Sequence, residues 1–303
     1  MENLENRESN QVEELTEKIH NEFPELEFSN IELVNKGGDH LVAVADNMWV
    51  FRFPKTERQV KSFSDEIAIL KALEEKVSVK IPDYEYVSKE KDFGGYKMIE
   101  GEELSIERFE DLSEEEKKTI AKQLGNFLST VHSLPVKMAE SFQLCNSPKA
   151  SQSKYINGRR EVIAEHIDPE LIKKIDGFYK QFLKIEPPNT TVIHGDLGGD
   201  HVLSTPEKGV SGVIDFGDVA VGDPASDFSF LWSYGEDFLN EVLNHYELEE
   251  DADFSNRAHW YFVRSLVNKM YKICRNGEDL KHYPELLTKH LVELKKTGKR
   301  KKK

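Results

Sequence analysis

Short apolar segments alternate with turn-forming residues through the first hundred positions of the chain. The segments carry the β-branched, aromatic and aliphatic side chains that strands favour, and they lie at Ile31–Val34, Leu41–Ala45, Met48–Phe53, Tyr84–Ser88 and Tyr96–Ile99. A helical spacing of apolar residues over Val12–Phe23 precedes them, and another interrupts them between Gln59 and Glu75. The pattern predicts a small lobe of mixed strands and helix that covers residues 1–99.

The periodicity becomes that of helices after a polar segment at residues 100–103. Ser113 and Glu116 have the spacing of a capping box, and the helix that they start carries one apolar face as far as Val131. A second amphipathic helix spans Leu171–Leu183, and further helices fill residues 228–294. We therefore expect an α+β fold of two lobes, in which a hinge at 100–103 leads to a larger, mainly helical lobe at 104–294.

The charge balance limits the class of partner. The chain has 41 Lys and Arg against 56 Asp and Glu, a net charge of −15, and such a surface repels the phosphate backbone of a nucleic acid. Residues 295–303 form a short basic tail, which a solvated terminus explains, with contact to a nucleic acid or an acidic surface as the alternative.

Other composition features point to a protein of the cytoplasm. The two cysteines, Cys145 and Cys274, are too few for a disulfide framework or a cysteine-rich zinc site. No apolar segment is long enough to span a bilayer, and the acidic N-terminus lacks the features of a signal peptide. We expect a cytoplasmic monomer with neither a membrane nor a nucleic acid as partner.

Residues 192–218 are the most informative stretch of the chain. In this stretch, each cluster of polar residues follows a run of apolar residues. Asp196 comes after Val192-Ile193-His194-Gly195, and Asp215 comes after Gly212-Val213-Ile214. Phosphoryl transfer needs a carboxylate to orient and deprotonate a hydroxyl, and further ligands to hold Mg²⁺ on the nucleotide phosphates. Asp196 fits the first task, and His201 and Asp215 fit the second. The alternative is a pair of unrelated loops with capping aspartates.

The joint pattern resembles that of the aminoglycoside phosphotransferases, which share the bilobal fold of the protein kinases. The motifs that carry the resemblance are His194-Gly195-Asp196, Ile214-Asp215-Phe216-Gly217-Asp218 and Asp223-Pro224-Ala225-Ser226-Asp227. A histidine at position 201 is similar to the branch that phosphorylates the 2″-hydroxyl, and also to the macrolide phosphotransferases, whereas most relatives have Asn there.

The resemblance implies a role for each motif residue. Asp196 is implied as the catalytic base, His201 and Asp215 as ligands of Mg²⁺, and Asp227 and His194 as supports of the catalytic loop. The co-substrate implied is ATP or GTP.

In the first lobe, the resemblance implies a nucleotide site. Arg52 stands where kinases have their phosphate-binding Lys, with Glu66 on the next helix as its partner in preference to Asp65. A guanidinium can bridge phosphate oxygens and a carboxylate, and Lys55 is an alternative phosphate contact. Further candidates are the glycines of the loop that would cover the phosphates and the residues that would meet the purine, namely Gly37, Gly38, Met98 and Glu100.

The acceptor implied is a cationic aminoglycoside, phosphorylated at the 2″-hydroxyl, which would make the protein an antibiotic-resistance enzyme. Eight of the eighteen residues from Glu236 to Asp253 are acidic and none is Lys or Arg, so this segment would attract polycations, unless it is only a solvated helix face. The candidate substrate contacts are Asp200, Trp232, Glu236, Asp237 and Glu241.

Three other functions stay open. An apolar pocket around Trp232 would favour a macrolide as acceptor. A metabolic small-molecule kinase has the same motifs, and a non-catalytic nucleotide-binding regulator would keep the fold without turnover.

Overall fold

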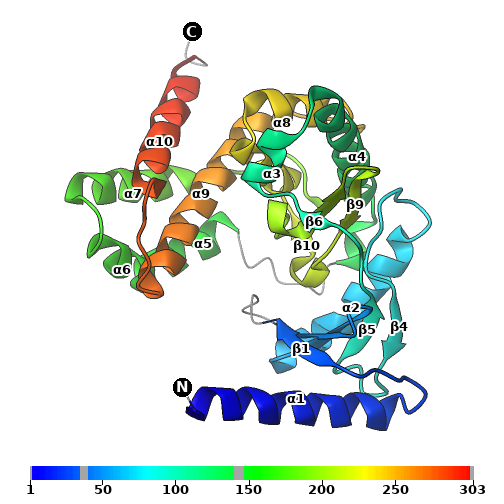
Figure 1. Ribbon diagram of the computed structural model, residues 1–303. Helices are drawn as coiled ribbons and strands as arrows, with labels where there is room; N and C mark the ends of the chain where they lie inside the picture. Colours follow the sequence, from blue (N-terminus) through cyan, green and yellow to red (C-terminus); the bar gives the residue numbers. More distant parts are fainter. Residues whose placement is uncertain (1, 35–39, 140–146, 301–303) are drawn as a thin grey trace. The chain divides into compact units, whose positions relative to one another are not determined.

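The computed structural model describes residues 2–34, 40–139 and 147–300. The chain divides into two compact units (Figure 1). Unit 1 consists of Met1–Leu104 and Asp200–Gly217, and unit 2 consists of Ser105–Gly199 and Asp218–Lys303.

Unit 1 is built on an antiparallel sheet of five strands in the order β1-β2-β3-β5-β4. Its strands and helices are α1 (Glu2–Glu22), β1 (Ile31–Val34), β2 (His40–Ala45), β3 (Trp49–Pro54), α2 (Glu57–Leu73), β4 (Tyr84–Val87) and β5 (Gly94–Lys97). The predicted strands are present with shifts of one or two residues, whereas α1 begins ten residues before the predicted Val12.

One face of this sheet forms an apolar core with α1. Leu15, Ile19 and Phe23 of α1 pack with Phe51 and Phe53 of β3. Because neighbouring residues of a strand point to opposite faces, Arg52 between these two phenylalanines lies on the other face. The alternation of β3 therefore sends a charged residue to the side opposite α1.

A second segment of the chain completes unit 1. Strand β6 (Glu102–Glu103) pairs with β8 (Val202–Thr205), which pairs with β9 (Gly209–Val213). Lys80, which follows α2, forms a parallel bridge with Gly212. Residues 200–217, which lie inside the predicted lobe 104–294, thus belong to unit 1 because their strands pair there.

Unit 2 is mainly helical. Its elements are α3 (Ile106–Asp111), α4 (Glu114–His132), α5 (Pro148–Lys154), α6 (Arg160–Ala164), α7 (Pro169–Phe182), β7 (Thr191–Ile193), β10 (Ala220–Gly222), α8 (Glu236–Leu243), α9 (Phe254–Arg275) and α10 (Tyr283–Arg300), with a 3₁₀ helix at Pro224–Ser233. The predicted capping box of α4 is present, with both hydrogen bonds between Ser113 and Glu116. The prediction of a strand-rich part followed by a larger helical part is confirmed.

A buried apolar cluster of unit 2 joins α7, α9 and α10. Phe178 and Phe182 of α7 pack there with Tyr261 and Met270 of α9 and Leu287 of α10. Helix α10 continues to Arg300, so the backbone of the predicted tail at 295–303 is helical for most of its length. Within the described residues, no helix combines the length and the apolar character needed to cross a membrane.

Two glycines in helices of unit 2 give a matched test of packing. A Cβ on Gly125 of α4 would lie 2.6 Å from the carbonyl oxygen of Val242, whereas a Cβ on Gly177 of α7 meets nothing within 4 Å. We expect Gly125→Ala to lower the free energy of unfolding by about 1–3 kcal/mol through overpacking. Gly177→Ala should raise it by about 0.5–1 kcal/mol, because alanine favours the helix. Urea unfolding checks both, and equal effects of the two changes would contradict the packing of α4.

Candidate functional site

The guanidinium of Arg52 binds two carboxylates of unit 1. Its Nη1 donates to Glu66 Oε1 at 2.7 Å, and its Nη2 donates to Asp215 Oδ1, also at 2.7 Å. Tyr84 donates its hydroxyl to the same oxygen of Glu66 at 3.2 Å. Arg52 and Glu66 are both almost fully buried, whereas the side chain of Asp215 is 44% exposed. Arg52, Glu66 and Asp215 thus connect β3, α2 and the segment that follows β9.

Electrostatics keep this arginine charged. Burial by itself would lower the pKa of Arg52, but the carboxylates of Glu66 and Asp215, together with Tyr84, hold that pKa well above its usual value. A buried guanidinium is stable only when such partners surround it. Arg52 is therefore a fixed positive charge beside the exposed carboxylate of Asp215.

His201 and Asp215 meet at the ends of paired strands. Val202 pairs with Val213 across β8 and β9, and the Ile214 N–H donates to the His201 carbonyl at 3.0 Å. His201 Nε2 comes to 3.5 Å from Asp215 Oδ2. Asp215 has a positive φ of 64°, a conformation that costs energy for a residue other than glycine and is concentrated at functional sites.

These two side chains form a mixed donor set. A carboxylate oxygen suits Mg²⁺, whereas an imidazole nitrogen is a softer ligand than the amide oxygen of Asn. Asp215 Oδ1 is engaged by Arg52, and Oδ2 is the atom nearest to His201. Asp215 fits a magnesium ion directly, and His201 adds a nitrogen donor on the same side.

In unit 2, the buried carboxylate of Asp227 holds the loop that contains Asp196. It accepts the backbone N–H of His194 at 2.6 Å and that of Gly195 at 3.0 Å, and it lies 3.1 Å from His132 Nε2. Burial alone would raise the pKa of Asp227, but these partners lower it below the ordinary value. The loop is therefore fixed by an ionised group beneath it.

The glycine of this loop is required by its geometry. Gly195 has a φ of 88°, and a Cβ there would overlap the carbonyl of Asp218. Its neighbour Asp196 is exposed at the surface of unit 2. The carboxylate of Asp196 thus reaches solvent from a backbone that has little freedom to move.

Three residues that the sequence analysis did not assign support this region. His132 of α4 binds Asp227 and also lies 2.8 Å from the hydroxyl of Tyr246. Arg257 of α9 donates to both oxygens of Asp223, at 2.8 and 3.2 Å. Arg264 of α9 is buried, and burial lowers its pKa while Tyr179 and Asp196 act against that shift. The sequence signal that could have indicated these three residues is a polar side chain on the apolar face of a helix.

The predicted purine contacts lie next to β5. The Met98 N–H donates to the carbonyl of Met48 at 2.7 Å, and the Met98 side chain is 44% exposed. The carbonyl of Glu100 accepts the hydroxyl of Ser211 at 2.6 Å. The Met98 N–H thus serves the fold, and its exposed side chain is the part that can cover a purine. Gly37 and Gly38 lie outside the described residues.

The predicted acceptor contacts differ in their surroundings. Asp200 is exposed on a short 3₁₀ helix, Gly199–His201, and Glu236 and Asp237 are exposed in the first turn of α8, where acidic residues also complement the helix dipole. Glu241 is half-buried and lies 3.7 Å from His245.

Trp232 packs into the helical core of unit 2. Its indole stacks on the ring of His259, with centroids 3.8 Å apart and planes at 13°, and it packs against the cluster formed by α7, α9 and α10. These contacts give Trp232 a packing role in unit 2.

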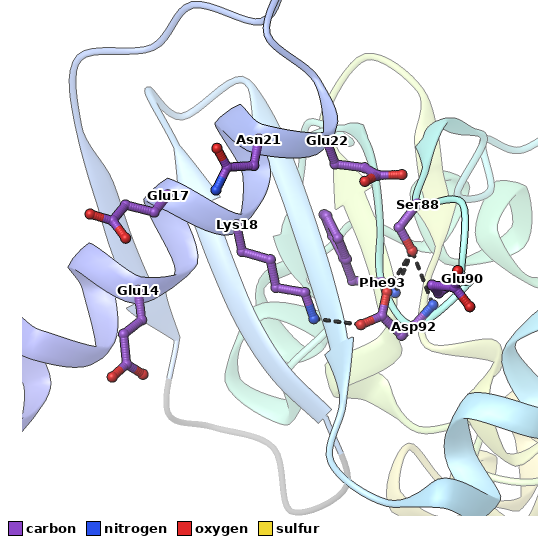
Figure 2. Close-up of a pocket in the computed structure, with 9 residues that line it drawn as sticks. All are labelled: Glu14, Glu17, Lys18, Asn21, Glu22, Ser88, Glu90, Asp92 and Phe93. Carbon is purple, nitrogen blue, oxygen red and sulfur yellow. Dashed lines mark hydrogen bonds and ion pairs between the residues drawn. The ribbon is translucent and has the colours of Figure 1, made fainter.

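A cavity of unit 1 lies away from these motifs in the sequence. About 390 Å³ in volume, it is lined by α1 and the loop before β5 (Figure 2), and Lys18 of α1 donates to Asp92 there at 2.5 Å. Ser88 and Asp92 form a second hydrogen bond of 2.7 Å. The bond from Lys18 fastens α1 to the loop, whereas the bond from Ser88 lies within the loop. Of the predicted site residues that the structure describes, none lines the cavity.

Comparison with known proteins agrees with this arrangement. The sequence profile of the Phosphotransferase enzyme family matches residues 31–260. Viomycin phosphotransferase of Streptomyces vinaceus is 48% identical over 58 residues, which are 18% of this chain and 20% of that protein. The match therefore spans about a fifth of the relative's length.

Solved structures share the fold over nearly the whole chain. A GDP and kanamycin complex of APH(2″)-IIIa superposes with a TM-score of 0.75 and 23% identity, covering 94% of this chain and 99% of the other. A streptomycin–ATP complex of APH(2″)-IIa gives a TM-score of 0.64 and 24% identity, covering 85% and 89% of the two chains. The predicted kinase-like fold of the aminoglycoside phosphotransferases is confirmed.

The buried ion pair of unit 1 yields a stability prediction. Arg52→Met leaves the carboxylate of Glu66 buried without its cation, which should cost about 3–5 kcal/mol of unfolding free energy. The double variant Arg52→Met/Glu66→Leu should recover most of that loss, because an apolar pair replaces an orphaned charge. Urea unfolding of both measures the difference, with the exposed Arg275→Met as control. A double variant as unstable as the single one would show that Glu66 is not the source of the cost.

The buried carboxylate of unit 2 yields a pH prediction. The pKa of Asp227 is lower in the folded chain than its ordinary value, so its contribution is complete at neutral pH and is lost as the pH falls through the folded pKa. Asp227→Asn should reduce unfolding free energy by about 3 kcal/mol at neutral pH, and the gap to the wild type should narrow below about pH 4.

The control for this prediction is Asp279→Asn. Asp279 is exposed, and its carboxylate accepts the Lys281 N–H at 3.0 Å. Its replacement should change stability little at any pH. A gap for Asp227→Asn that stays constant from pH 7 to about pH 3 would contradict an ionised Asp227.

Proposed function

The chain belongs to the phosphotransferase enzyme family, and we propose that it transfers the γ-phosphoryl group of ATP or GTP to a hydroxyl of an aminoglycoside. The 2″-hydroxyl is the proposed position, and the modified antibiotic would lose its action on the cell.

The observation that carries the proposal is the support of Asp196 by Asp227. A general base must be held in position while it remains accessible to the acceptor hydroxyl. The N–H groups of His194 and Gly195, directly before Asp196, are bound by a buried carboxylate, and Asp196 itself is exposed. This combination is what a base for phosphoryl transfer requires, and an ordinary capping aspartate has no need of it.

The nucleotide would be held by the charged group of unit 1. Asp215 and His201 would bind Mg²⁺, which when present neutralises the negative charge of the phosphates. The guanidinium of Arg52 orients Asp215 through a 2.7 Å hydrogen bond, and it adds a fixed positive charge for the phosphates. Structures of relatives in complex with GDP and with ATP support either nucleotide as donor.

The acceptor assignment rests on charge and on relatives. The chain carries a net charge of −15, and Asp200, Glu236 and Asp237 are exposed carboxylates that can attract ammonium groups. The relatives with this fold include complexes with kanamycin and with streptomycin. Because Trp232 packs on His259 in the helical core, it gives a macrolide less support than these carboxylates give an aminoglycoside.

The test is a transfer assay with mass detection. The protein is incubated with Mg²⁺, ATP and GTP, each alone, and with kanamycin, gentamicin and erythromycin. We expect kanamycin or gentamicin to gain one phosphoryl group, and Asp196→Asn to lower kcat by about 10²–10⁴-fold with nucleotide affinity nearly unchanged. The exposed Asp168→Asn serves as the matched control and should keep full activity.

Other outcomes identify the alternatives. Transfer to erythromycin alone would establish a macrolide kinase. Nucleotide binding without transfer to any of the three would overturn the proposed acceptor class and favour a metabolic kinase or a regulator. Full activity of Asp196→Asn would remove Asp196 as the base.

A further inference from the structure

Two histidines and a glutamate of unit 2 come together where α9 and α10 pack. His259 lies on α9, and His290 and Glu293 lie on α10 at a spacing of three residues, which places them on the same helix face. The two helices follow one another along the chain through a short turn (Figure 1). Their fold therefore fixes three metal-ligating side chains from two elements.

The three donor atoms converge on one point. His259 Nε2 is 2.8 Å from His290 Nδ1, His290 Nδ1 is 3.2 Å from Glu293 Oε2, and His259 Nε2 is 4.0 Å from that same oxygen. Metal–ligand distances of about 2.0–2.2 Å in a tetrahedral site place ligands about 3.4 Å apart. The observed separations lie on both sides of that value, so a shift on the order of half an ångström would bring all three to an ion.

Hydrogen bonds among the three groups satisfy them only in part. One proton can lie between the two ring nitrogens, since each neutral imidazole has one donor and one acceptor nitrogen. If His259 holds that proton, His290 Nδ1 accepts it and has no proton to donate to the carboxylate of Glu293. If His290 holds it, one N–H faces two acceptors. A divalent cation would satisfy all three atoms at once.

The two histidines are buried in the protein, and the glutamate is partly exposed to solvent. His259 is 2% exposed and His290 is 5% exposed, while the side chain of Glu293 is 37% exposed. Trp232 stacks on His259, and Phe262 meets the His290 ring edge-on, with centroids 4.9 Å apart. The rings are thus held by packing, and Glu293 leaves an entry from solvent.

Burial also keeps the imidazoles in the form that binds metal. It lowers the pKa of His259 to about 3, with His290 adding to the shift, and it lowers the pKa of His290. Glu293 acts against the shift of His290, and Lys289 adds to it. Both rings are neutral near pH 7 and present lone pairs.

We propose that His259, His290 and Glu293 form a zinc site that fastens α10 to α9, with water as the fourth ligand. Two imidazole nitrogens and one carboxylate are a donor set that zinc accepts, whereas Mg²⁺ and Ca²⁺ prefer oxygen ligands. The proposal is independent of the phosphoryl transfer proposed above, because its residues are on α9 and α10 and Asp196, His201 and Asp215 are not. Its role is to stabilise the C-terminal helix.

The experiment measures zinc binding to the full chain after removal of metal by a chelator. Calorimetric titration with Zn²⁺ should give one site per chain, and Co²⁺ should give the intense visible absorption of a tetrahedral complex. Zinc at about 100 times its Kd should raise Tm by about 5 °C. Glu293→Gln should weaken zinc binding on the order of 100-fold while it preserves the fold, since Glu293 is partly exposed.

Matched variants separate this site from others. Glu285→Gln, on an exposed position of the same helix, should leave zinc affinity unchanged. His201→Asn removes the histidine of a different pair, that of His201 and Asp215, and the single zinc ion should still bind. His290→Gln should abolish the tetrahedral Co²⁺ spectrum.

Three results would overturn the proposal. The first is zinc affinity that is the same in the wild type, Glu293→Gln and His290→Gln. The second is zinc binding that disappears in His201→Asn and persists in Glu293→Gln, which would place the ion at His201. Absence of any one-to-one binding by the wild-type chain, with no change in Tm, would also refute the site.

Discussion

A charged group can be buried only where its partners are built into the fold, and Arg52 imposes this constraint on unit 1. The alternation of β3 that places Phe51 and Phe53 against α1 turns Arg52 to the other face. There its two hydrogen bonds of 2.7 Å, to Glu66 and to Asp215, connect a strand, a helix and the end of a distant hairpin. The position of Asp215 thus follows from the need to neutralise a buried cation.

Unit 2 contains the opposite case, a buried anion whose partners are also part of the fold. Asp227 is surrounded by two backbone N–H groups and by His132, and the backbone that it binds leads directly into Asp196. Arg257 of α9 likewise binds the carboxylates of Asp223 and Asp251, which both precede it in the chain. In each unit, a buried ion pair or hydrogen-bonded carboxylate therefore positions a carboxylate that reaches solvent, Asp215 in unit 1 and Asp196 in unit 2.

Local rules explain what the sequence could predict. The capping box of Ser113 and Glu116 needs only neighbouring residues, and the strands of unit 1 follow from short-range alternation. Contacts between distant segments escape such rules: His132, Arg257 and Arg264 stand on helices whose apolar periodicity predicts only a packed core. Helices α5 and α6 are too short to give a clear apolar period, and a kink at Asn157 and Gly158 separates them. The proximity of His259 and His290 could not be predicted from the sequence, because it depends on how α9 and α10 pack.

Unit 1 consists of two stretches of chain with unit 2 residues between them. During synthesis at about 5–20 residues per second, roughly 5–20 seconds pass between the completion of the first stretch and that of the second. Over this interval the nascent sheet holds Arg52 with Glu66 but without Asp215, and β6 has no strand to pair with. The entropy of closing so long a loop grows only logarithmically with its length, so the delay is set by translation more than by search. The unit that begins to emerge first from the ribosome therefore stays incomplete until residues 200–217 have followed it.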